Sequence, residues 1–212
     1  MFKNKKTFFI LSTMVIIISV LVAIIWLQQK VEATKCAFDR GAYYRLENLE
    51  KRTKEALVKI NNIGGSTKVS ISDIAELRLL NSRVSQELWY LNLEVYDYNW
   101  KINNIKDYEN KEELSPDIID FYCQHLKEIY SKNTDIDFEK ESEAFQIIRK
   151  YYYGIQEILD GKSVHMDNIV AVDKEQLINM GKWIDMTFEL NKYHKDFWAK
   201  NREMLFKDTK LK

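Results

Sequence analysis

The chain is poor in the residues that interrupt or cross-link a fold. Its 212 residues include one Pro, six Gly and two Cys. So few turn formers cannot separate the many short strands of a sandwich or barrel, and a disordered or collagen-like chain would be far richer in them. Two Cys are too few for a disulfide-dense scaffold or a four-cysteine zinc site. These absences favour an all-α fold of long helices.

Residue patterns for catalysis, metal binding and nucleic-acid binding are scarce as well. Lys+Arg and Asp+Glu are tied at 32 each, so no basic excess indicates nucleic acid. The positions three before His125, His165 and His194 are Tyr, Lys and Asn, so the Glu-x-x-His pattern of di-iron bundles is missing. The sequence also lacks the glycine-rich phosphate motifs, GxSxG and HExxH. We expect neither an enzyme nor a cofactor or metal site.

One long apolar run dominates the N-terminal part. Residues 7–27 hold no charged residue, and a bilayer core about 30 Å thick needs about 20 apolar residues in a helix. Trp26 stands near the end of the run, where its ring favours the membrane interface. We interpret residues 7–27 as a single transmembrane helix in the lipid bilayer, a signal anchor. The alternatives are a signal peptide cleaved after Val31-Glu32-Ala33, a loose match, and a buried core helix.

The flanking charges predict the orientation of this span. Lys3, Lys5 and Lys6 load the six-residue tail 1–6, and a short basic tail resists translocation, whereas a long domain crosses largely regardless of its charge. We therefore expect a single-pass protein of the cell membrane with a cytoplasmic N-terminus and an extracytoplasmic domain. Residues 1–30 hold four of the 32 basic residues and none of the acidic ones, so the remainder is acidic by four charges.

Residues 28–212 are predicted to form one antiparallel bundle of about five helices with coiled-coil-like packing. Their apolar residues recur in alternating steps of three and four, which is the heptad spacing. Connections are short enough for consecutive helices to run antiparallel. The predicted helices cover about 32–62 (continuous with the membrane span), 72–108, 115–131, 138–159 and 173–206.

Two positions inside these helices predict unusual packing. Asn81 interrupts the apolar seam of 72–108, where it either sets the register of the bundle or lies on an exposed stretch. Gly154 is either a tolerated glycine or a point of close helix approach, and Gly181 raises the same question. The helix 72–108 also has apolar residues off its seam, so we expect it to have several neighbours; these are Leu80, Trp89, Leu93, Tyr96 and Trp100.

The two cysteines suggest a disulfide. Cys36 lies at the base of the first predicted helix, and Cys123 lies about two turns into a helix that should start near the same level. In an oxidising exterior they can pair, closing a loop that stabilises the fold by about 4 kcal/mol in the chain-entropy model. Two buried thiols and an intermolecular Cys36–Cys36 bond are the alternatives.

These features indicate a membrane-anchored scaffold or interaction module of the cell envelope. Its partner is another protein or a second copy, and Tyr153 is a candidate exposed contact within the cluster 151–153. A ligand-sensing bundle that binds a small molecule between helices and signals through a partner is a second hypothesis. A lysis or envelope-fusion component is a third, because the anchor-plus-helix plan is similar to that of phage spanins, a likeness of topology alone.

Overall fold

The computed structural model describes residues 2–66, 68–102, 118–130, 135–161 and 182–206. Within them it is all-α apart from one short strand pair, with five helices packed as a bundle. The chain divides into two compact units, Met1–Phe38 and Asp39–Lys212. Helix α1 (Phe2–Gly64) runs through the boundary without a break, as predicted for the span and the helix that follows it.

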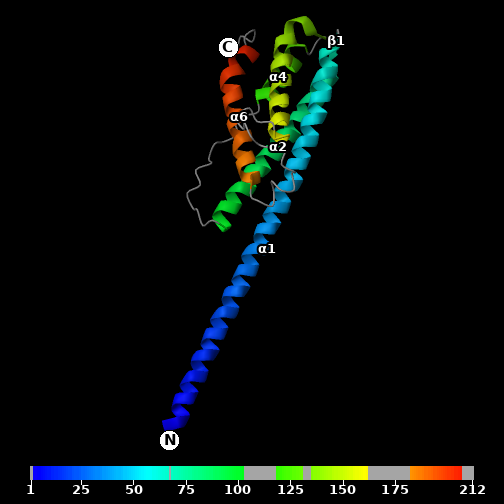
Figure 1. Cartoon of the computed structure of the whole chain (residues 1–212). Helices are drawn as coiled ribbons and strands as arrows, with labels where there is room; N and C mark the ends of the chain where they lie inside the picture. Colours follow the sequence, from blue (N-terminus) through cyan, green and yellow to red (C-terminus); the bar gives the residue numbers. More distant parts are fainter. Residues whose placement is uncertain (1, 67, 103–117, 131–134, 162–181, 207–212) are drawn as a thin grey trace. The chain divides into compact units, whose positions relative to one another are not determined.

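The second unit contains the other helices, which lie beside the C-terminal half of α1 (Figure 1). They are α2 (Ile71–Lys101), α3 (Ile118–Ile129), α4 (Phe138–Leu159) and α6 (Lys182–Leu205). Apolar residues at heptad spacing form its core, with the predicted seam of α1 fully inside; that seam is Ala42, Leu46, Leu49, Thr53, Ala56, Ile60 and Ile63. The heptad prediction is thus confirmed for α1, because these positions share one face of the helix.

Two three-residue strands were missed by the sequence analysis. β1 (Lys68–Ser70) pairs antiparallel with β2 (Asp135–Asp137), and Val69 lies opposite Ile136. We had predicted only a connection between the helices over 115–131 and 138–159, where β2 lies. Val69 and Ile136 are both buried, so the pair covers one end of the core. Strands this short have no alternation pattern that a sequence can reveal.

Several predicted helix limits need correction or lie outside the described residues. Helix α2 begins one residue before the predicted start at 72 and is capped by Ser70, because the Ser70 hydroxyl accepts from the Asp73 N–H and the Asp73 carboxylate accepts in return. Helix α4 ends at the predicted residue 159, and Gly161 follows with φ +70°. Predictions that lie outside the described residues concern the end of α2 at 108, the Ser115-Pro116 start of α3, the 173–181 start of α6 and Gly181.

The junction between α1 and α2 depends on a network around Asp73. Lys59 Nζ donates to Asp73 Oδ1 at 2.7 Å and to Glu76 Oε2 at 2.5 Å, while the Ser70 N–H and hydroxyl both donate to Asp73 Oδ2. Hydrogen bonds from Lys59 and then from Ser70 lower the pKa of Asp73 to about 2. Burial lowers the pKa of Lys59, but its hydrogen bonds to Asp73 and Glu76 and the charges of both carboxylates outweigh this and raise the pKa overall.

We expect acid to weaken this junction in a defined pH window. The pKa of Asp73 is lower in the folded chain, so its contribution is complete above the unfolded value of 3.8 and is lost as the pH falls towards 2. Asp73→Asn should cost about 1 kcal/mol at pH 7, as loss of a cap does, and should flatten the decline in stability between pH 4 and 2. Urea unfolding at each pH measures this. Glu76→Gln is the matched control, since it removes a Lys59 partner and leaves the cap; an equal effect of the two changes would contradict the capping role.

Candidate functional site

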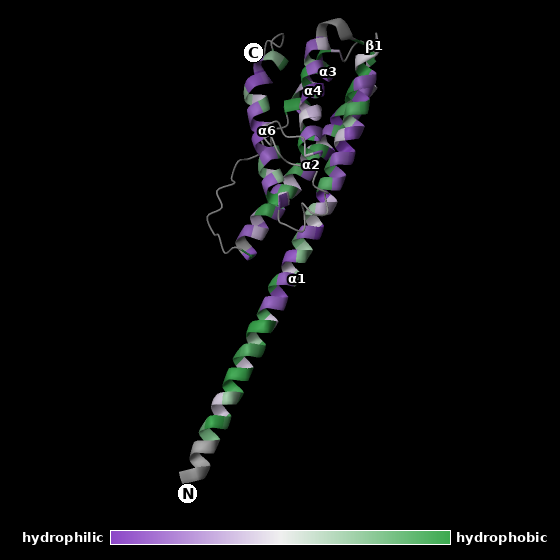
Figure 2. Cartoon of the chain, in the orientation of Figure 1, coloured by the Kyte–Doolittle hydropathy of each residue, from purple (hydrophilic) through white to green (hydrophobic). Residues whose placement is uncertain are grey.

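The first unit is an apolar helix whose side chains are exposed over the bilayer-length run. Its side chains from Phe8 to Leu27 are nearly all exposed, and Figure 2 shows hydrophobic residues along this part of α1. The hydroxyls of Ser12, Thr13 and Ser19 donate to backbone carbonyls three or four residues earlier. Polar groups satisfied inside the helix are what a bilayer interior requires. Among the described residues this is the helix that is long and apolar enough to cross a membrane.

The predicted interface anchors are only partly described. Trp26 is exposed, and Lys30 Nζ lies 5.3 Å from the centre of its ring. A cation beside an amphipathic ring at the end of an apolar run suits the headgroup region. The side chains of Lys3, Lys5 and Lys6 lie outside the described part of the structure. Their role in setting the orientation stays a prediction.

The strongest candidate site in the second unit is one face of α2, which we call the α2 outer stripe. Its large members are about half exposed: Leu79 at 52%, Trp89 at 49%, Leu93 at 43% and Tyr96 at 45%. The expectation that this helix has several neighbours is confirmed, because α1, α3, α4 and α6 all contact it. Leu80, one of its off-seam apolar residues, is buried, whereas Trp89, Leu93 and Tyr96 are about half exposed. The stripe consists of Leu79, Ser82, Gln86, Trp89, Leu93 and Tyr96.

The stripe is exposed because the neighbours of α2 pack on its other sides. Arg45 of α1 pairs with Glu87 on one side at 3.2 Å. On the other side Arg78 forms a bidentate ion pair with Asp120 of α3, in which Nε donates to Oδ1 at 2.6 Å and Nη2 donates to Oδ2 at 2.8 Å. The core-facing residues Leu77, Val84, Leu91 and Tyr98 are buried. The outer stripe lies opposite this row, since a shift of two residues turns a helix by about 200°.

The Trp89 ring contacts the Tyr90 ring, which in turn contacts Arg45 of α1. The rings of Trp89 and Tyr90 are 5.1 Å apart, and the Arg45 guanidinium lies 4.2 Å from the Tyr90 ring centre. Gln86 Nε2 donates to the Tyr90 hydroxyl at 3.4 Å. A ring supported from behind loses little conformational freedom on binding, which favours it as an anchor.

The Arg45 cluster also gives a reason for the lack of a side chain at Gly41. Arg45 Nε lies 3.6 Å from Glu94 Oε1, and a Cβ added to Gly41 would lie 3.1 Å from that carboxylate oxygen. Burial raises the pKa of Glu94, and the charge of Glu87 adds to this, while Arg45 opposes it. Sequence reasoning missed this cluster. The available signal was the seven-residue spacing of Arg45, Arg52 and Lys59 along α1.

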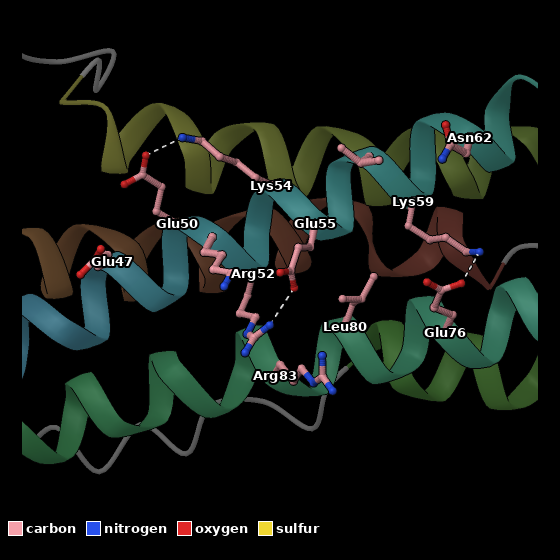
Figure 3. Close-up of a pocket in the computed structure, with 12 residues that line it drawn as sticks. Glu47, Glu50, Arg52, Lys54, Glu55, Lys59, Asn62, Glu76, Leu80 and Arg83 are labelled. Carbon is pink, nitrogen blue, oxygen red and sulfur yellow. Dashed lines mark hydrogen bonds and ion pairs between the residues drawn. The ribbon is translucent and has the colours of Figure 1, made fainter.

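A second feature is a charged groove between α1 and α2, with a volume of about 890 Å³ (Figure 3). Its charges are largely neutralised by their neighbours: Lys54 pairs with Glu50 at 2.6 Å, Arg52 with Glu55 at 2.8 Å, and Lys59 with Glu76 at 2.5 Å. Exposed Val58 is one of its few apolar residues. A groove of mutually paired charges is a solvated helix surface of low net charge, and it offers little to a charged ligand.

The polar residue in the α2 seam proves to be structural. Asn81 is 1% exposed, so the alternative of an exposed stretch was wrong. The Tyr152 hydroxyl of α4 donates to Asn81 Oδ1 at 2.8 Å. A buried pair of this kind fixes which residues of α2 and α4 face each other.

The two cysteines are both described, and each carries a thiol. Cys36 is exposed on α1, and Cys123 is 1% exposed on α3. Cys36 belongs to the first unit and Cys123 to the second. The predicted Cys36–Cys123 disulfide therefore stays a prediction.

The remaining candidates have mixed outcomes. Tyr153 is 46% exposed, as expected, and its role as a contact stays a prediction. Ile129, the last residue of α3, is exposed, and on α6 Met204 is exposed while Trp198 and Leu205 are buried. No group of three or more His, Cys, Asp or Glu in the described ranges could hold a metal ion.

Comparison with known proteins yields no relative. No family model matches the chain, and neither a curated protein nor a solved structure does. Its functional assignment therefore depends on the apolar helix of the first unit and on the surface of the second.

Proposed function

We propose that the chain is a single-pass membrane protein whose helical domain is an interaction module of the cell envelope. The α2 outer stripe is the observation that carries this proposal. Four large apolar or aromatic side chains on one helix face, each about half exposed, are typical of a protein-binding surface. The exposed apolar helix of the first unit supports the anchor.

The stripe favours a protein partner over a small molecule. Its residues lie along one helix face in steps of three and four, which is how a helix presents side chains to another helix. A small-molecule site is instead concave and encloses most of its ligand. We therefore propose a scaffold that recognises a helix of another chain. Crosslinking in intact cells followed by mass spectrometry tests this, and recovery of monomer alone would contradict it.

The native Cys36 provides a direct test of orientation. It is exposed and lies nine residues beyond Leu27, the end of the apolar run. If the domain is extracytoplasmic, a membrane-impermeant maleimide should label Cys36 in intact cells. Labelling that appears only after cell lysis would place the domain in the cytoplasm.

Two controls separate the other states of this cysteine. The Cys36→Ser chain should remain unlabelled, because Cys123 is 1% exposed. Treatment of the intact cells with an impermeant reductant before labelling tests the predicted disulfide. Labelling that requires the reductant, together with a monomer band on non-reducing gels, would support the Cys36–Cys123 bond; a dimer band would indicate Cys36–Cys36.

A further inference from the structure

We propose that the partner of the α2 outer stripe is a second copy of this chain, packed in parallel along the same stripe. This inference rests on the proposed function and names the partner. The second unit of each copy is joined to the apolar helix at Asp39. Within that unit α2 runs antiparallel to α1, since Lys59 pairs with Asp73 near the start of α2 and Arg45 with Glu94 near its end. We therefore expect two copies tethered at the same end to meet with their α2 helices parallel. In a parallel, two-fold symmetric contact each stripe residue faces its own counterpart.

The spacing of the stripe is that of a parallel coiled-coil seam. From Leu79 to Tyr96 the steps are three, four, three, four and three. Seams with this spacing normally face a partner helix, yet the large side chains here are exposed by 43 to 52%. The opposite face of α2 already packs in the core, so the stripe is a second seam on the same helix.

The charges of α2 are compatible with a two-fold axis along this stripe. A charged residue on such an axis would face an identical charge and repel it. Every charged residue of α2 lies off the stripe; these are Asp73, Glu76, Arg78, Arg83, Glu87, Glu94, Asp97 and Lys101. Self-association therefore meets no like-charge repulsion at its centre, although the helix is otherwise highly charged.

The chemistry of the central residues suits self-pairing. Gln86 carries both a donor and an acceptor, so two Gln86 amides can hydrogen-bond across the axis. Trp89 follows one turn later and contacts Tyr90, whose ring in turn lies against Arg45. Aromatic rings and Leu93 then supply the apolar contact. One polar pair beside an apolar cluster is the arrangement that sets register in parallel coiled coils.

The area of this contact explains why the anchor matters. Leu79 and Tyr96 are 17 positions apart, which is about 26 Å of helix. A contact of that length, roughly one helix diameter wide on each copy, buries on the order of 500 Å², about a third of a standard interface. Membrane anchoring supplies the remainder by raising the effective concentration of correctly oriented copies.

Cysteine crosslinking of the full chain in liposomes tests the geometry. Ser82→Cys and Leu93→Cys, each in a Cys36→Ser chain, should form same-residue disulfides when a mild oxidant is added. Glu157→Cys is the matched control, because it is exposed on α4 away from the stripe. Crosslinking of the control as efficiently as the stripe positions would overturn the proposal.

A charged side chain placed on the proposed two-fold axis tests whether the α2 outer stripe stabilises the pair. Leu93→Lys places two ammonium groups opposite each other, so the crosslink yield at Ser82→Cys should fall about tenfold or more, as at a binding hot spot. Tyr153→Lys adds the same charge to an equally exposed aromatic position on α4 and should leave the yield unchanged. Circular dichroism is used to check that both variants fold, and Trp89→Ala provides an uncharged second test of the same surface.

The outcomes distinguish this inference from the proposed function. If crosslinking in cells recovers a different protein and Leu93→Lys abolishes it, while same-residue disulfides never form, self-association is wrong and the interaction module stands. If neither a second copy nor another protein is recovered, both fail. If same-residue disulfides form and respond to Leu93→Lys, both are supported.

Discussion

Trp183→Ala is expected to cause the largest loss of stability of any single truncation in the bundle, about 3–5 kcal/mol. Trp183 is completely buried on α6, and its ring lies edge-on to Tyr98 of α2 with 5.7 Å between ring centres. Its indole Nε1 donates to Asp39 Oδ1 at 2.9 Å. The substitution removes a large apolar side chain and also leaves a buried carboxylate without this donor.

Two comparisons separate these contributions. Trp183→Phe keeps most of the apolar volume and removes the donor, so it should cost about 1–3 kcal/mol. Trp89→Ala is the matched surface control and should cost less than about 1 kcal/mol, because Trp89 is half exposed. Urea unfolding of the full chain in detergent, followed by circular dichroism, measures all three. Equal losses for Trp183→Ala and Trp89→Ala would contradict the central position of Trp183.

Gly154→Ala is expected to destabilise the bundle, although alanine is the better helix former. A Cβ at position 154 would lie 2.6 Å from Tyr193 Cε2 and closer still to the hydroxyl. The Tyr193 ring can avoid it only by giving up its hydrogen bonds to the carbonyls of Lys150 and Tyr151, at 3.1 and 3.2 Å. Overpacking of this kind costs about 1–3 kcal/mol. Gly154→Leu should cost considerably more.

Removing the Tyr193 ring should reverse the sign of this effect. In a Tyr193→Ala chain the clash is gone, so Gly154→Ala should stabilise by about 1 kcal/mol through helix propensity alone. A double-mutant cycle of thermal or urea unfolding measures the coupling between the two positions. Equal effects of Gly154→Ala in both backgrounds, or of Gly154→Leu and Gly154→Ala in the native background, would contradict the close approach of α4 and α6.

Gly154 also illustrates how much a single sequence can predict. A glycine inside a helical pattern indicates either tolerance or close approach, and only the position of Tyr193 on α6 distinguishes them. Asn81 is a similar case, since Tyr152 lies 71 residues away and converts a polar interruption into a buried hydrogen bond. Such pairs depend on helix register, which hydrophobic periodicity within one helix does not specify.

Most of the large residues of the α2 outer stripe could be identified from the sequence, but their exposure to solvent could not. Trp89, Leu93 and Tyr96 are recognisable as apolar residues off the main seam of α2, and from them we expected several neighbours for this helix. Whether a second face is covered depends on where the remaining helices pack. In the structure α1, α3 and α4 contact α2 on other sides through Arg45, Asp120 and Tyr152. The structure therefore identifies this exposed second face of α2 as a candidate binding surface.

The sequence by itself determined the all-α class, the apolar N-terminal helix and the heptad cores, because these follow from composition and from spacing along one helix. The tertiary structure alone decided the antiparallel β1–β2 pair, the contact of Gly154 with Tyr193, the burial of Asn81 and the exposure of the α2 outer stripe. Each of these depends on which residues of distant segments meet. That choice is made by the packing of whole helices against one another, a property of the assembled bundle and not of any one segment.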